Sequence, residues 1–97
     1  MEPSTDRRLH VREAIDAGLE IEWTSSDGVR HSLVGSAMDS SKAGLAGVFP
    51  DYAPIGQILT VTLTDVGLRG QGVVRHSTPV DAEFLIGIAL MGDLQDT

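Results

Sequence analysis

Residues 15–23 alternate between apolar and polar or small side chains, and this period of two constrains the fold more than any other feature. The apolar members are Ile15, Ala17, Leu19, Ile21 and Trp23. Successive side chains of an extended strand point to opposite faces, so the pattern predicts a half-buried strand. Such a strand needs partners that cover its apolar face.

The rest of the chain repeats this kind of segment at short spacing. An Asp27-Gly28 pair predicts a hairpin turn into a second strand over residues 29–38. Further strands are predicted at residues 45–49, 59–64, 69–76 and 84–91, with loops at residues 50–56 and 77–81. The total is five or six strands without a long helix.

Many short strands and few aromatic residues favour an all-β domain, a small antiparallel barrel or sandwich. Gly70, Gly72 and Gly87 lie inside predicted strands, where glycine usually marks a bulge or a tight bend. With 97 residues we expect a single domain: an arm over residues 1–13, a barrel over 14–92 and a frayed tail over 93–97.

Net charge and cysteine content exclude several classes of function. The formal charge of −7 disfavours binding to DNA or RNA, and the absence of cysteine removes disulfides and thiolate metal ligands. No apolar run reaches the roughly 18 residues of a membrane helix, and the N-terminus lacks the apolar core of a signal peptide. We therefore expect a cytoplasmic protein without membrane insertion.

The residues that could support catalysis or metal binding are poorly arranged for either. His10, His31 and His76 stand far apart in the chain, which predicts no metal site. Ser40 and Ser41 precede Lys42 without the glycine pattern of a nucleophile elbow. We expect a protein that is not an enzyme and has no catalytic residues or cofactor.

Two short motifs flank the predicted strands and suggest a ligand. Arg8 and Arg12 form R-x-x-x-R, and guanidinium groups bind phosphate oxygens and guanine edges. Asp39, Ser41 and Gly44 form D-x-S-x-x-G, in which the carboxylate can accept from guanine N–H groups. Gly44 permits a positive φ or a close backbone approach.

Each motif taken alone is more often a solvated pair or a polar turn. From the residue counts, chance predicts roughly 0.36 occurrences of the first motif and roughly 0.08 of the second in such a chain. Both motifs occur in this order around predicted strands, which favours the ligand-binding interpretation.

This combination resembles the PilZ domain family over nearly the whole chain. Besides the two motifs, the segment from Gly72 to Arg75, G-V-V-R, and the closing F-L-I-G-I-A-L are similar to the last two strands of that family. Leu90 stands where the family prefers Phe, and the chain leaves room for little or no C-terminal helix.

The resemblance implies a six-stranded antiparallel PilZ-type β-barrel with a flexible arginine arm, and it implies binding of the bacterial second messenger cyclic di-GMP. By that resemblance Arg8 and Arg12 bind the phosphates and guanine bases, and Asp39 and Ser41 hydrogen-bond a guanine. Gly44 keeps the backbone out of the way of the ligand. Arg7 stands where a further basic residue is associated with binding a ligand dimer. Ligand binding would order the arm and change the surface offered to a downstream effector protein.

Two alternatives remain open at this point. One is a PilZ-like adaptor that acts by protein contact without a nucleotide, although such members generally lack the arginine motif. The other is a small barrel that binds single-stranded nucleic acid, which the −7 charge and the few aromatic residues disfavour.

Overall fold

The computed structural model describes residues 18–40 and 44–96, and all regular structure in these ranges is β-strand. No helix of the described residues is long and apolar enough to cross a membrane. The strands are β1 (Gly18–Thr24), β2 (Arg30–Ser40), β3 (Gly44–Phe49), β4 (Ile58–Leu63), β5 (Leu68–Val80), β6 (Glu83–Leu90) and β7 (Gln95–Asp96).

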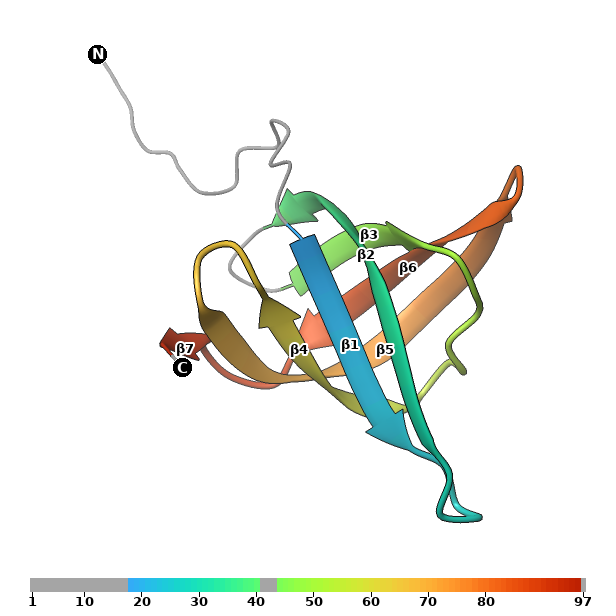
Figure 1. The fold of residues 1–97 in the computed structure, drawn as a ribbon, viewed down its shortest axis with the longest axis horizontal. Helices are drawn as coiled ribbons and strands as arrows, with labels where there is room; N and C mark the ends of the chain where they lie inside the picture. The colour runs from blue at the N-terminus through green and yellow to red at the C-terminus, as the bar shows by residue number, and fades with distance from the viewer. Residues whose placement is uncertain (1–17, 41–43, 97) are drawn as a thin grey trace.

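Six of the strands close into an antiparallel barrel, so the predicted all-β barrel is confirmed (Figure 1). The strand order is β4-β1-β2-β3-β6-β5, and pairing of β4 with β5 closes the ring. Every pairing is antiparallel. Closure removes most of the sheet edges that an open sheet of this size would expose.

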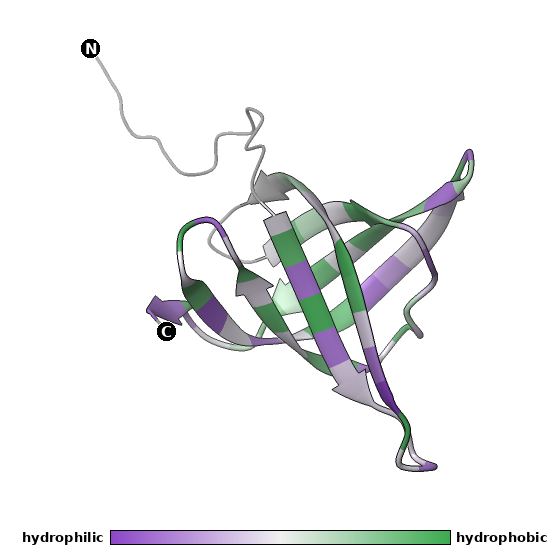
Figure 2. Ribbon diagram, in the orientation of Figure 1, coloured by the Kyte–Doolittle hydropathy of each residue, from purple (hydrophilic) through white to green (hydrophobic). Residues whose placement is uncertain are grey.

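The alternation that begins the sequence places one face of each strand inside the barrel. In β1 the side chains of Leu19, Ile21 and Trp23 are buried, whereas those of Glu20 and Glu22 lie on the outer face. Figure 2 shows this alternation of hydrophobic and hydrophilic residues along β1. The remaining core residues are Ala37, Leu45, Phe49, Ala53, Leu59, Val61, Leu63, Val74, Ile86 and Ile88.

Two β-bulges bend the long strands. The register between β5 and β6 shifts between Val74 and His76, so Arg75 is the extra residue. A similar shift between Ala37 and Asp39 occurs where β2 pairs with β3. Bulges increase the local twist and allow one strand to pass from one neighbour to the next, as β5 does from β4 to β6.

Gly87 lies opposite the bulge in β5. It pairs with His76, and a Cβ atom at Gly87 would collide with the imidazole ring. The ring therefore lies directly over the backbone of β6. The extra residue of this bulge is in β5, and Gly87 is its partner position in β6.

Two segments differ from the sequence prediction. Residues 77–80, predicted as part of a loop, extend β5 and pair with β6. Val80 and Glu83 form the pair next to the turn and close the hairpin. Pro79 is in the next pair, where the backbone N–H would point away from β6, so a proline there removes no hydrogen bond between the two strands. The predicted frayed tail also forms β7, whose Gln95 pairs with Arg69 of β5.

Candidate functional site

The predicted ligand residues fall largely beyond the residues that the structure describes. Arg7, Arg8, Arg12 and Ser41 lie outside the described residues. The backbone of Asp39 lies near the end of β2 in register with Ala46, and Gly44 begins β3.

The described residues that flank the two motifs lie at the same end of the barrel. The chain enters β1 at Gly18, which pairs with Ser36, and β2 continues from there to Ser40. Because β1 and β2 are antiparallel, the start of β1 and the end of β2 lie together (Figure 1). We call this the entry end, and we call the opposite end, where Thr24 pairs with Arg30, the turn end.

Gly44 has a structural reason to be glycine. It pairs with Ala89, and a Cβ atom on Gly44 would lie 2.5 Å from the carbonyl oxygen of Ile88. Of the two properties that the sequence suggested for Gly44, the structure shows the close backbone approach.

The outer face of β3 and β6 beside Gly44 carries small and medium apolar side chains. The paired positions on this face are Gly44 with Ala89, Ala46 with Gly87, and Val48 with Leu85. The alternate side chains, such as Leu45 and Ile86, point into the core. The His76 ring covers Gly87 on this face, so the small side chains there do not form an open flat surface.

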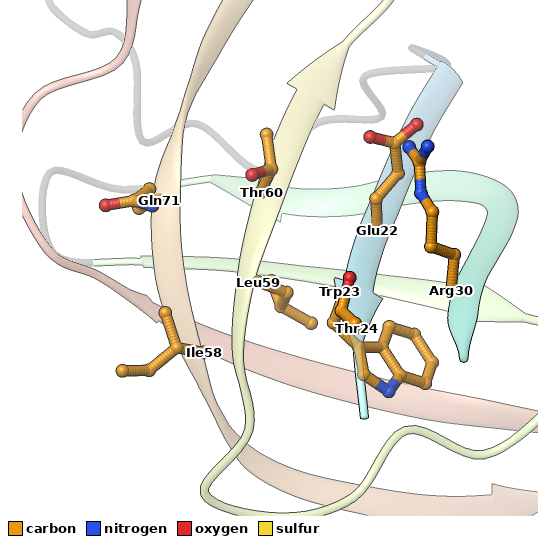
Figure 3. Close-up of a pocket in the computed structure, with 8 residues that line it drawn as sticks. All are labelled: Glu22, Trp23, Thr24, Arg30, Ile58, Leu59, Thr60 and Gln71. Atoms are coloured by element: carbon orange, nitrogen blue, oxygen red, sulfur yellow. The ribbon is translucent and has the colours of Figure 1, made fainter. Parts of the chain in front are cut away.

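A separate pocket of about 250 Å³ lies toward the turn end on the outer face of β1, β4 and β5 (Figure 3). Glu22 pairs with Thr60, and Thr60 pairs with Gln71, so three hydrogen-bonding side chains form a row across three strands. The Arg30 side chain extends toward the Glu22 carboxylate (Figure 3). Trp23, Thr24, Ile58 and Leu59 complete the lining.

This pocket has the groups to hydrogen-bond a small polar molecule. It contains a carboxylate, a guanidinium, two threonine hydroxyls and an amide, and no histidine, serine or cysteine. Across the described residues, no group of three or more side chains is arranged to hold a metal ion. Sequence reasoning missed the pocket because Glu22, Thr60 and Gln71 are brought together only by barrel closure.

A Ser–His–Asp grouping at the turn end stabilises a turn. The Ser25 hydroxyl contacts the carboxylate of Asp27, the carbonyl of Val29 and Nε2 of His31. When the hydroxyl donates its one proton to an oxygen partner, Nε2 of His31 is the donor in the third contact. All three partners belong to the β1–β2 hairpin itself.

The hydrogen bonds of this turn favour the charged form of Asp27. The Ser25 hydroxyl donates to the carboxylate, and the N–H of Val29 also donates to it, so the pKa of Asp27 is lowered. On the other side of the hairpin, the His31 ring stacks on Trp23 with centroids 5.0 Å apart. These contacts hold the β1–β2 hairpin in shape.

Comparisons with protein-family models, with curated proteins and with solved structures find no match for this chain. The resemblance to PilZ domains therefore depends on the two motifs and the strand pattern.

Proposed function

We propose that this protein is a receptor for cyclic di-GMP that binds the nucleotide without catalysing a reaction. In this proposal Arg8 and Arg12 contact the phosphates and bases, while Asp39 and Ser41 hydrogen-bond a guanine. Arg7 adds a further positive charge for a second ligand molecule. Ordering of the arm over the entry end alters the surface available to an effector protein.

The observation that carries this proposal is that the chain enters the barrel at Gly18, at the end where β2 finishes near Asp39. Arg12 precedes Gly18 by six residues, which span at most about 20 Å when fully extended. Asp39 lies three residues beyond Ser36, the register partner of Gly18. Covalent geometry therefore keeps the arginine motif within reach of the D-x-S-x-x-G motif.

The direct test is calorimetric titration of the full chain with cyclic di-GMP. We expect binding by the wild type and loss of binding in Arg8→Ala and Asp39→Ala. Arg30→Ala is the matched control, because it removes one positive charge at the turn end. A stoichiometry near two ligands per chain would support the role of Arg7.

Flat heats from folded wild-type protein would contradict the proposal. They would favour the adaptor interpretation, in which the barrel acts through protein contacts alone. Binding that is unchanged in both Arg8→Ala and Asp39→Ala would also contradict the assigned site.

A further inference from the structure

One edge of the barrel is open along residues 30–34 of β2. On one side these residues pair with β1, but pairing with β3 begins only at Ser36. After Phe49 the chain leaves β3, and the turn-end half of β2 continues without a strand on that side (Figure 1). Within the described part of the chain, this stretch has a partner strand on one side only.

Two hydrogen bonds establish which backbone groups face this open edge. The N–H of Ser25 donates to the carbonyl of Val29 at 2.9 Å, which makes this a bonded pair of the β1–β2 hairpin. The carbonyl of Gly18 accepts from Thr64 and therefore points toward β4. Because bonded and non-bonded pairs alternate in an antiparallel ladder, odd-numbered residues of β2 in this stretch bond to β1.

The even-numbered residues Arg30, Ser32 and Val34 consequently direct their N–H and C=O groups outward along the open edge. Their side chains lie on the outer face and are all exposed. The side chain of Val34 is 64% exposed, more than that of any other exposed large apolar residue in the described chain.

A second open edge, along residues 75–80 of β5, is protected in a way that β2 is not. Pairing of β5 with β4 ends at Val73, so the following residues also lack a strand on that side. There the bulge at Arg75 twists the edge, and Pro79 removes a donor. The edge of β2 contains no proline and no bulge over residues 30–34.

We propose that two copies of this chain associate through antiparallel pairing of β2 with β2, centred on Ser32. In this register Ser32 pairs with its own copy, and Arg30 pairs with Val34 of the partner subunit. All three residues direct their backbone groups to the edge, so the pairing forms about six N–H···O=C bonds. The result is an isologous dimer with a sheet continuous between two barrels.

The side chains of this edge are complementary to their own copy. The Ser32 hydroxyl donates to Oε2 of Glu20 at 3.3 Å, so the Glu20 carboxylate extends from β1 toward β2. In the proposed register, Arg30 of the partner subunit lies opposite Val34, diagonal to Ser32. Its methylene stem covers Val34, and its guanidinium reaches the Glu20 carboxylate.

A charge exchange between two variants tests this register. Glu20→Arg places two arginines together in its own homodimer, and Arg30→Glu places two carboxylates together. We expect each variant alone to dimerise at least about tenfold more weakly than the wild type in sedimentation velocity. An equimolar mixture restores both opposite-charge pairs, so it should form a heterodimer near the wild-type affinity.

A backbone substitution tests the hydrogen bonds directly. Ser32→Pro removes an N–H that faces the open edge and no backbone hydrogen bond within the barrel, so it should abolish the dimer and leave a folded monomer. Ser32→Ala is the matched control, since it removes the same hydroxyl but retains the N–H, and it should still dimerise. Circular dichroism checks that each variant is folded.

A wild type that sediments as a monomer over a concentration series overturns the proposal. A dimer that persists in folded Ser32→Pro, or a mixture of the charge variants that stays monomeric while the wild type dimerises, overturns this interface. The test uses no nucleotide, so its outcome is independent of the proposed receptor function.

Discussion

Gly35 is the position where one added methyl group should do the most damage to the barrel. It lies in β2 opposite Leu19 of β1. A Cβ atom there would meet the carbonyl oxygen of Val48 and would lie 2.7 Å from Cδ2 of Phe49. The Phe49 ring is fully buried, and a backbone carbonyl cannot rotate away, so β2 and β3 would have to separate.

The expected loss of stability follows from two opposing effects. Replacing glycine by alanine stabilises a protein by about 0.4–1 kcal/mol where the native conformation accepts it, because the unfolded chain loses freedom. Overpacking a core typically costs about 1–3 kcal/mol, and a clash with backbone belongs at the upper end. We expect Gly35→Ala to lower the free energy of unfolding by about 2 kcal/mol, and the melting temperature by about 8–16 °C.

Thermal and urea unfolding followed by circular dichroism measures this change. Ser36→Ala is the control, because it alters an exposed neighbour in the same strand and should change stability by less than about 0.5 kcal/mol. The double variant Gly35→Ala with Phe49→Leu should lose less than the sum of its single variants, since the smaller side chain makes room. A melting temperature of Gly35→Ala equal to that of wild type would refute the close approach of β2 to β3.

Three further predictions concern the turn, the core and the ligand. The lowered pKa of Asp27 means that its contribution to stability is present above the ordinary pKa of Asp and is lost as pH falls through the folded-state value. The difference in melting temperature between wild type and Asp27→Asn should therefore shrink on acidification, and a difference independent of pH would contradict this. Phe49→Ala should cost about 3–5 kcal/mol, measured by urea unfolding, because the ring is completely buried; a loss below about 1 kcal/mol would contradict its place in the core. Calorimetric affinity for cyclic di-GMP should fall as salt is raised, because arginine–phosphate contacts are screened, and a salt-independent affinity would argue against the arginine arm.

Part of the candidate site could be anticipated from the sequence, because short motifs are local. The spacing of Asp39 and Gly44 placed them at the junction of two strands, which is where β2 ends and β3 begins. The pocket beside Glu22 could not be anticipated, because Thr60 and Gln71 reach it from β4 and β5, which are distant in the chain. Likewise, no sequence pattern indicated that His76 lies over the backbone of Gly87.

The sequence by itself determined the position of most of the strands and which of their faces is buried. Alternation in β1 and in β4, and the Asp27-Gly28 turn, act over a few residues, and the structure follows them closely. These signals are local because side-chain alternation is a property of one extended strand, and a hairpin turn involves only the few residues that connect two strands.

The tertiary structure alone decided how the strands close and which edge stays open. The pairing of β4 with β5, the bulge at Arg75, the extension of β5 through Pro79 and the docking of β7 all depend on partners distant in the chain. Alternation identifies a face but not a neighbour, since any strand of the same period can pair along either edge. Closure of the ring selects the neighbouring strands. It leaves residues 30–34 of β2 paired with β1 along one edge and without a partner strand along the other edge.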